Sequence, residues 1–191
     1  MTTNDFTAVI LAGGAGRRLG GKDKGLVPYQ GRCLIEYSLA LTADCCCATL
    51  ISANRNLATY ATYGHPVIPD LVSSTTGPLS GLQACATSIS TDKVLVVACD
   101  MPSLTTNLVV RLQRLLSEDG CDAAVYQQAD TLQCSLFAIR QTCLSTLTPY
   151  LEGGQRSIKG WLQQQQLTII PATNALAFQN CNTPADLISN L

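Results

Sequence analysis

The first residues able to carry chemistry lie directly after a mostly apolar segment near the N-terminus. Residues 6–11 read FTAVIL, and residues 13–25 combine many glycines with two arginines and two lysines. Glycine lets a ligand approach the backbone closely, and successive backbone N–H groups form an anion-binding concavity. Arginine and lysine neutralise anionic charge. The segment therefore predicts a loop that binds a polyphosphate.

Two familiar phosphate motifs nearly fit this loop. Gly16 to Lys22 follows the Walker A spacing, but Asp23 replaces the hydroxyl residue that such loops use toward Mg²⁺. The dinucleotide fingerprint fails because its third glycine falls on Leu19. A flexible surface linker is the alternative, but linkers have no reason to concentrate cations. The loop also lies where open α/β sheets bind ligands.

A second candidate residue ends another apolar segment. Residues 94–98 read VLVVA, and Asp100 follows, two residues before Pro102. A carboxylate at the tip of a buried strand is costly unless it binds a partner. Mg²⁺ takes one or two protein carboxylates and completes its shell with water and substrate phosphates. We expect Asp100 to hold Mg²⁺; the alternative is that it caps the following helix or its turn.

Apolar runs alternate with helical patterns along the chain, which predicts an α/β fold with a mostly parallel central sheet and helices on both faces. At this length, one domain over residues 1–191 is expected. We expect strands at residues 8–12, 48–52, 66–68, 94–98, 122–126, 134–139 and 167–171. We expect helices at residues 33–42, 79–88, 107–117, 141–150, 157–165 and 184–191.

Composition excludes several classes of function. The net charge is −1 and 13% of residues are charged, which argues against a binder of nucleic acid or of an acidic membrane. No apolar run is long enough for a transmembrane helix, and the N-terminus lacks the basic region of a signal peptide. The ten cysteines include no C-x-x-C pair, so we expect reduced thiols in the cytoplasm and no structural zinc site. A single histidine leaves little room for a Ser-His-Asp triad.

The glycine-rich segment also carries a resemblance. Residues 11–20 together with Lys24 resemble the signature of nucleotidyltransferases that share a three-layer, Rossmann-like fold. Within them, residues 20–26 (GGKDKGL) are similar to the version found in the molybdenum cofactor guanylyltransferases, the MobA family. The resemblance extends over nearly the whole chain. It implies GTP as donor, molybdopterin carrying molybdenum as acceptor, Mg²⁺ as cofactor, and molybdoenzyme apoproteins or their chaperones as partners.

The same resemblance implies roles for individual residues. Lys24, Asp100 and Arg18 would be catalytic, and Asp100 would also be the metal ligand. Arg156, Asn180 and Asn182 would lie on the pterin and phosphate side, although asparagine also favours turns by itself. The nucleotide-binding residues would be Leu11, Ala12, Gly13, Gly14, Lys24, Ser52, Asp70, Gly77, Gly81 and Asp100.

Two of the nucleotide-binding positions have rival interpretations. Ser52 stands where the family often carries asparagine, and its hydroxyl has a shorter reach. Asp70 follows a short strand, where an aspartate also serves as a turn residue.

The residues by themselves do not separate GTP from CTP. A cytidylyltransferase acting on molybdopterin or on a sugar or polyol phosphate therefore stays open. From another class, a non-catalytic module that carries a nucleotide or the cofactor stays open too. The presence of both Lys24 and Asp100 favours catalysis over carriage, because a carrier has no need to neutralise charge that develops in a reaction.

Overall fold

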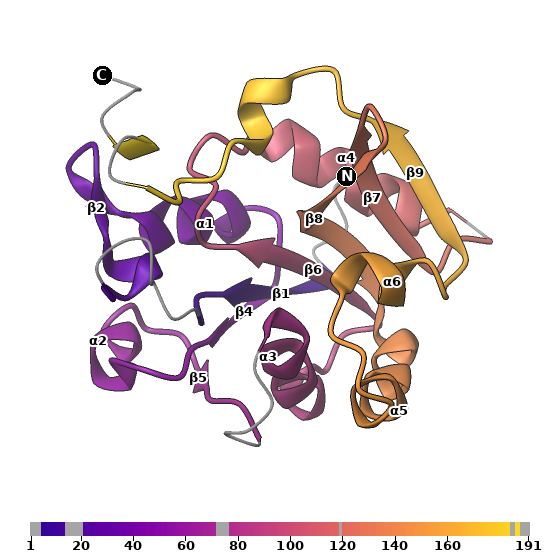
Figure 1. The fold of residues 1–191 in the computed structure, drawn as a ribbon, viewed down its shortest axis with the longest axis horizontal. Coiled ribbons are helices and arrows are strands. Elements are labelled where there is room, and N and C mark those ends of the chain that lie inside the picture. The colour runs from indigo at the N-terminus through magenta and orange to yellow at the C-terminus, as the bar shows by residue number, and fades with distance from the viewer. Residues whose placement is uncertain (1–4, 14–20, 72–76, 119, 184–185, 188–191) are drawn as a thin grey trace.

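The computed structural model describes residues 5–13, 21–71, 77–118, 120–183 and 186–187. Its centre is a seven-stranded sheet in the order β5-β4-β1-β6-β8-β7-β9 (Figure 1). β8 runs antiparallel to its neighbours β6 and β7, and the other pairings are parallel. The strands are β1 (Phe6–Leu11), β4 (Ala48–Ser52), β5 (Val67–Ile68), β6 (Lys93–Ala98), β7 (Ala123–Gln128), β8 (Thr131–Arg140) and β9 (Leu167–Pro171).

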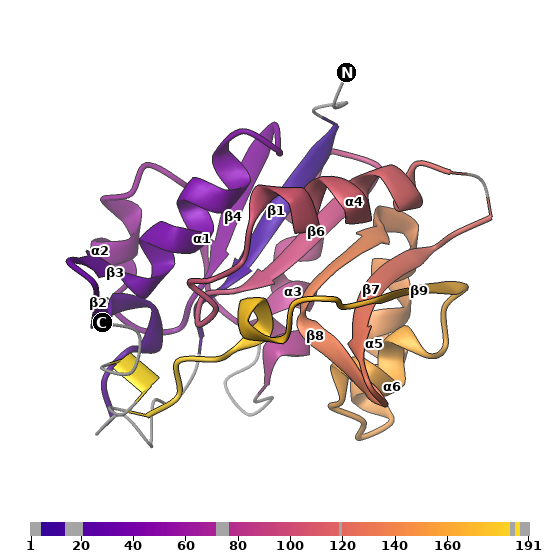
Figure 2. The ribbon, with the colours of Figure 1, turned by 90° about the horizontal axis from the view of Figure 1, so that it is seen from above.

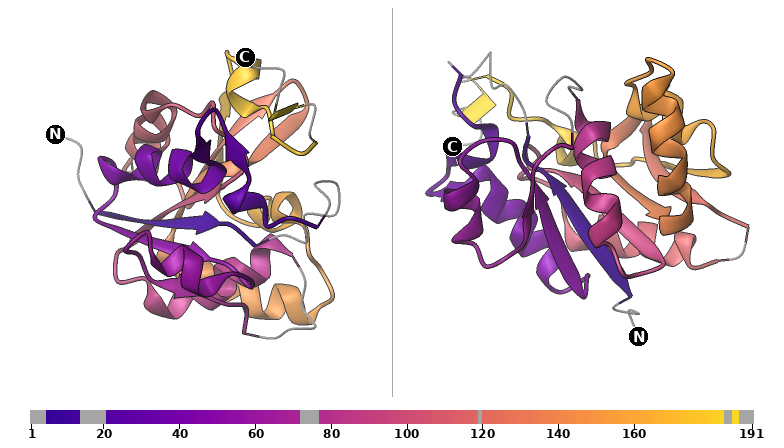
Figure 3. Two further views of the ribbon diagram at one scale, coloured as in Figure 1. Left: turned by 90° about the vertical axis from the view of Figure 1, so that its left-hand side faces the viewer. Right: turned by 90° about the horizontal axis from the view of Figure 1, so that it is seen from below.

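Helices cover both faces of the sheet, which confirms the predicted three-layer α/β fold (Figures 1 and 3). The helices α1 (Leu34–Ala43) and α4 (Thr106–Leu116) lie on one face. The helices α3 (Pro78–Cys85), α5 (Leu147–Glu152) and α6 (Ile158–Leu162) lie on the other. Alternate side chains of β1 serve the two layers: Val9 packs in the α3 and α6 cluster, and Ala8 in the α4 cluster.

Short elements complete the described part of the chain. A small hairpin of two short strands, β2 and β3, and the helix α2 lie toward the β5 side of the molecule (Figure 1). The remaining elements of the described residues are η2 (Lys24–Leu26), β2 (Pro28–Tyr29), β3 (Arg32–Cys33), α2 (Leu57–Ala61), η3 (Ala86–Ser88), η4 (Gln141–Thr146) and η5 (Ala175–Phe178). Within the described residues, every helix is too short or too polar to cross a lipid bilayer.

The core accounts for the apolar composition. Trp161 is fully buried in α6, stands edge-on to Phe137 at 6.4 Å between ring centroids, and donates its indole N–H to Thr146 Oγ1 at 2.8 Å. All ten cysteines are free thiols, and most of them are buried. Burial raises the pKa of Cys46 and of Cys85 to about 12, so these thiols stay protonated and pack as small apolar groups.

Most expected elements are confirmed, and some bounds are corrected. The strands at 48–52 and 167–171 match β4 and β9 residue for residue. The segment 141–150 begins as a 3₁₀ helix, because Ser145 and Thr146 hydroxyls bond carbonyl oxygens three residues back. α6 ends at Leu162, since the next glutamines bond in turns. Of the expected C-terminal helix, Asp186 and Leu187 are helical, and its other residues lie outside the described ranges.

The carboxyl ends of four parallel strands form one row. Leu11 is the register partner of both Ser52 in β4 and Ala98 in β6, and Ser52 is in turn the partner of Ile68 in β5. The chain passes from β1 to β4 and β5 on one side of β1 and then crosses to β6 on its other side, so the strand order reverses between β1 and β6. This strand arrangement creates a switch point, the place where open α/β sheets bind ligands. The glycine-rich segment follows β1 there.

The segment after β9 returns across the molecule to the same edge. Figure 2 shows it running in yellow from β9 past the end of β6 toward the β2 and β3 hairpin. Cys181 of this segment is buried together with Val27, Tyr29 and Leu34. The last described residues of the chain therefore reach the carboxyl edge of the sheet.

Candidate functional site

Three polar side chains from distant parts of the chain meet at the switch point. Lys24 Nζ donates to Asp100 Oδ2, in an ion pair, and also to Asn182 Oδ1. The two side chains of the ion pair are largely withdrawn from solvent, with 19% of Lys24 and 11% of Asp100 exposed. The structure thus brings together three of the residues singled out in the sequence, in surroundings where their charges are weakly screened.

The carboxylate of Asp100 keeps one oxygen for another ligand. Among the described residues its Oδ1 is buried and has no hydrogen-bond partner. The residue does not cap α4, because that helix has Thr105 at its N-cap and no side-chain capping bond there. The part of the alternative in which Asp100 caps the helix is therefore wrong. A buried carboxylate oxygen without a donor fits the oxygen ligation that Mg²⁺ prefers.

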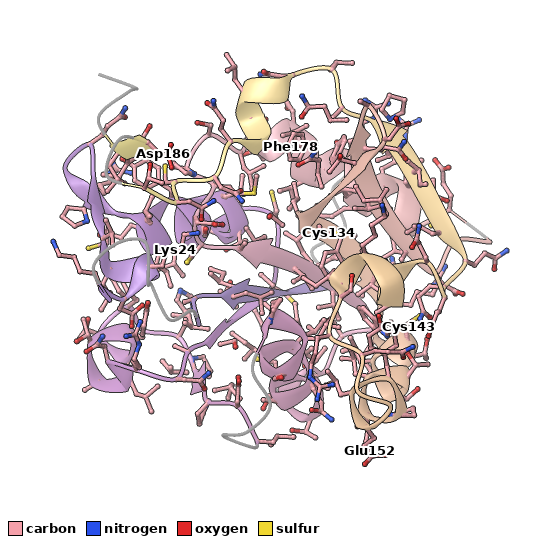
Figure 4. All side chains as sticks on the ribbon, in the orientation of Figure 1. Lys24, Cys134, Cys143, Glu152, Phe178 and Asp186 are labelled. Carbon is pink, nitrogen blue, oxygen red and sulfur yellow. The ribbon has the colours of Figure 1, made fainter. Side chains whose placement is uncertain are left out.

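The C-terminal segment is fastened to this cluster by backbone and side-chain bonds. Cys181 N donates to the Asp100 carbonyl oxygen at 2.8 Å, which ties the segment to the end of β6. Asp186 Oδ2 accepts from the backbone N–H of Asn182 at 2.8 Å and of Thr183 at 2.7 Å. Figure 4 labels Lys24 and Asp186, which come from opposite ends of the chain. These bonds hold Asn182 where its amide oxygen reaches Lys24.

A pH prediction follows from Asp186. The bonds from Asn182 N and Thr183 N lower the pKa of its carboxyl below the usual 3.8. The carboxylate therefore stabilises the folded segment at pH values above the unfolded pKa, and this contribution is lost as the pH falls through the lowered folded value. At neutral pH we expect Asp186→Asn to have a smaller free energy of unfolding than the natural chain. Below about pH 4 this difference between the two proteins should shrink, because the natural chain loses the contribution of the carboxylate. Urea unfolding from pH 7 to pH 3 measures this, and parallel stability curves for the two proteins would contradict it.

A second polar group lies at the ends of β4 and β5. Asn54 Oδ1 accepts from Asp70 N at 2.8 Å, and a Cβ on Gly13 would stand 3.6 Å from Asn54 Nδ2. Burial raises the pKa of Asp70, and a hydrogen bond with the Asn54 side chain opposes that rise. This arrangement places a half-buried carboxylate beside the start of the glycine-rich segment.

Helix α3 approaches the same group closely. A Cβ on Gly81 would stand 2.1 Å from Ser52 Oγ and 3.5 Å from Asp70 Oδ1, so the helix can lie there only because Gly81 has no side chain. Gly77 precedes α3 with φ = 139°, a conformation that glycine allows. Ser52 is 3% exposed, and its hydroxyl is packed beneath Gly81.

The first amides of the loop already have partners. Ala12 N and Gly13 N donate to the Ser52 carbonyl oxygen at 2.9 and 3.0 Å. These bonds join the loop to the end of β4, so these two N–H groups serve the fold. The next candidates for phosphate contacts, Gly14 and Arg18, lie outside the described residues.

Two other predicted residues have no hydrogen bond to Lys24, Asp100 or Asn182 among the bonds of the described residues. Arg156 is exposed in the connection between α5 and α6, where its guanidinium donates to the carbonyl oxygens of Leu151 and Gln155, both at 2.6 Å. Asn180 is exposed and precedes Cys181 in the C-terminal segment. The cluster thus contains one of the three residues expected on the pterin side.

Sequence reasoning missed several residues that shape the site. Asp186 follows Thr183 at the spacing S/T-x-x-D/E, the capping-box pattern, which would have marked it. Asp23, Asn56 and Tyr60 hold the turn that carries Lys24. No sequence motif marks these three as a group, because they meet only through packing.

The comparisons with known proteins bear on this geometry. Residues 8–168 match the MobA-like NTP transferase domain. The chain belongs to the MobA-like NTP transferase family. Its enzymatic activity is therefore nucleotidyl transfer, as the glycine-rich loop and the Lys24–Asp100 pair predict.

Relatives of this transferase match almost end to end. The molybdenum cofactor guanylyltransferase of Cupriavidus metallidurans is 35% identical over 195 residues, covering 98% of this chain and 95% of that protein. The protein of the same name from Shewanella frigidimarina is 36% identical over 178 residues, covering 93% and 91%.

Solved structures share the fold of the transferase. Molybdopterin-guanine dinucleotide biosynthesis protein A from Archaeoglobus fulgidus superposes with a TM-score of 0.80 at 24% identity, covering 96% of this chain and 95% of that one. The 2-C-methyl-D-erythritol 4-phosphate cytidylyltransferase from Thermus thermophilus superposes with a TM-score of 0.72 at 14% identity, covering 95% of each chain. At these identities the likeness concerns the fold.

Nucleotidyltransferases of this type generally use a divalent metal ion. The described residues contain no group of three or more His, Cys, Asp or Glu able to hold a metal. A single carboxylate is nevertheless sufficient where substrate phosphates and water complete the shell. Among the described residues, Asp100 Oδ1 is a buried carboxylate oxygen without a hydrogen-bond partner.

Proposed function

We propose that this transferase moves GMP from GTP to Mo-molybdopterin, forming the guanine dinucleotide cofactor and releasing pyrophosphate. The observation that carries the proposal is the Lys24–Asp100–Asn182 cluster at the switch point. The names of relatives matching more than nine-tenths of the chain supply the substrates.

The reaction needs alignment and charge neutralisation more than proton transfer. A phosphate oxygen of the acceptor attacks the α-phosphorus of GTP, and a new P–O bond forms there. The bond to the β-phosphate breaks, and pyrophosphate leaves with its electron pair. The attacking oxygen is already anionic, so no strong general base is required. Catalysis by position and by fixed charge is sufficient.

Lys24 would then stand over the α-phosphate, where negative charge builds. In the structure its ammonium is paired with the Asp100 carboxylate and donates a hydrogen bond to Asn182 Oδ1. A nucleotide phosphate would replace Asp100 as its anionic partner, and Asn182 would keep it oriented. Arg18 and the amides of the glycine-rich loop would bind the other phosphates.

Mg²⁺ would be held by Asp100 and would supply further neutralisation of the phosphate oxygens. Asp70, Gly77 and Gly81 would lie on the nucleoside side, where Gly81 allows close approach. Arg156 and Asn180 would meet the acceptor. A single domain would carry all of these parts.

Pyrophosphate release tests the proposal directly. GTP, CTP and ATP are compared at fixed Mg²⁺, each with and without molybdopterin carrying molybdenum. We expect release with GTP that requires the pterin. Preference for CTP would retain the mechanism and change the donor, whereas tight GTP binding with no release under any condition would favour a carrier.

The surroundings of the reaction follow from the same proposal. We place it in the cytoplasm, where ten free and mostly buried thiols stay reduced. The finished cofactor would pass to molybdoenzyme apoproteins or to their chaperones.

A further inference from the structure

The turn that carries Lys24 is bonded to the α2 region through one carboxylate, that of Asp23. Asp23 stands at the N-cap of η2 (Lys24–Leu26), yet its side chain makes no capping bond to that turn. Its Oδ1 accepts from Tyr60 Oη at 2.5 Å, and its Oδ2 accepts from Asn56 Nδ2 at 3.0 Å. Both carboxylate oxygens therefore face the α2 region. We call these three residues, Asp23, Asn56 and Tyr60, the Asp23 anchor.

The anchor is rigid on the α2 side. Tyr60 is fully buried, and burial followed by its bond to Asp23 raises its pKa, so the hydroxyl stays a donor. Asn56 lies in the left-handed region at φ = 49°, which asparagine adopts more readily than most residues other than glycine, and it precedes α2 as its N-cap residue. A bond to a carboxylate from such fixed donors fixes the position of the acceptor in turn.

The backbone beside Lys24 also lies directly against the anchor. A Cβ on Gly25 would stand 2.5 Å from Tyr60 Oη and 3.2 Å from its ring. Only glycine lets the turn pack so near the tyrosine. Asp23 and Gly25 flank Lys24, so the anchor contacts the chain on both sides of that lysine.

We propose that Tyr60 and Asp23 are positioning residues that act through Lys24. They fix the turn so that the ammonium reaches the Asp100 and Asn182 position without further ordering. Neither residue touches the three polar side chains of the cluster, and their effect passes through the backbone of residues 23–25. The kinetic part of the test rests on the proposed function.

Tyr60→Phe removes the hydroxyl and keeps the buried ring. We expect kcat to fall about 10- to 100-fold, the scale of a misplaced catalytic group, with a smaller change in KM for GTP. Tyr63→Phe is the matched control, because that tyrosine is half-buried beside α2 and bonds Cys33 instead of Asp23. Gly25→Ala displaces the same hydroxyl from the opposite side and should lower kcat in the same way.

A double-mutant comparison separates positioning from general packing. If Tyr60 acts through Lys24, Tyr60→Phe should change the residual rate of Lys24→Ala less than about twofold. A loss of the same size in both backgrounds would overturn the inference. So would an unchanged kcat, or an equal loss with Tyr63→Phe.

A second readout needs no turnover. The chain has only four lysines, Lys22, Lys24, Lys93 and Lys159, so ¹³C-dimethylated side chains give four assignable NMR signals. The Lys24 signal, assigned with Lys24→Arg, should move in Tyr60→Phe and stay in place in Tyr63→Phe. If the Lys24 signal moves in Tyr60→Phe but the natural chain turns over no GTP, the proposed function is contradicted and the positioning role of the Asp23 anchor stands. If the signal does not move, the positioning role is contradicted.

Discussion

Lys24→Ala is expected to lower kcat by about 10²–10³-fold, the range found when one fixed group that stabilises transition-state charge is removed. Asp100 and Asn182 hold the ammonium in a largely buried position. Its charge is therefore fixed in place and weakly screened by solvent. Pyrophosphate release at saturating GTP measures the loss. Lys159→Ala is the matched control, because Lys159 is an exposed lysine of α6, outside the glycine-rich segment.

Stability must be separated from catalysis in this variant. Removal of Lys24 leaves the Asp100 carboxylate without its cation, and an uncompensated, mostly buried charge destabilises the fold. The double variant Lys24→Ala/Asp100→Asn removes both charges and should regain thermal stability without regaining rate. A rate near that of the natural chain in a folded Lys24→Ala protein would remove Lys24 from the mechanism.

The strands and the edge that carries the site were predictable because parallel strands buried on both faces read as continuous apolar runs. β1, β4 and β6 follow this rule, and Asp100 at the end of β6 was found from it. The alternation of such runs with helical patterns then predicted a mostly parallel sheet, in which most strands have their carboxyl ends at one edge. Residues 14–20, which carry the strongest motif, lie outside the described residues, so their role stays a prediction.

The elements that sequence reasoning missed are short and depend on tertiary packing. α2 (Leu57–Ala61) buries a single tyrosine, Tyr60, and begins at a left-handed asparagine. The β2 and β3 strands are two residues long, so they present no periodicity to read. Such segments form because the rest of the fold supplies their partners, and no local pattern announces them.

The contacts within the site were also beyond the sequence. Lys24 lies 76 residues from Asp100 and 158 residues from Asn182 along the chain. The pairing of β1 with β6 brings the first two segments to one edge, and the return of the C-terminal segment adds Asn182. Ser52 illustrates the reverse case. Its hydroxyl is packed under Gly81, whereas its carbonyl oxygen binds the start of the loop. Residue type alone did not predict this division of roles.

Asp100→Asn is expected to raise the Mg²⁺ concentration for half-maximal rate by at least about 10-fold, since even outer-shell partners of bound metals contribute 10–100-fold in affinity. The substitution keeps the shape of the side chain and removes the charge of the buried, unpartnered Oδ1. A Mg²⁺ titration of pyrophosphate release measures the shift. Asp130→Asn, an exposed aspartate in the turn between β7 and β8, should leave the titration curve in place.

The two variants of the ion pair distinguish a metal ligand from a mere partner of Lys24. Both Lys24→Ala and Asp100→Asn abolish the pair of charges. If the pair itself were what matters, the two proteins would lose rate and keep the same dependence on Mg²⁺. If Asp100 holds the metal, Asp100→Asn raises the Mg²⁺ concentration for half-maximal rate. Lys24→Ala does not raise it, because that variant leaves the carboxylate free and removes a competing cation. A normal titration in Asp100→Asn would therefore assign the metal to other ligands and leave Asp100 as the group that orients Lys24.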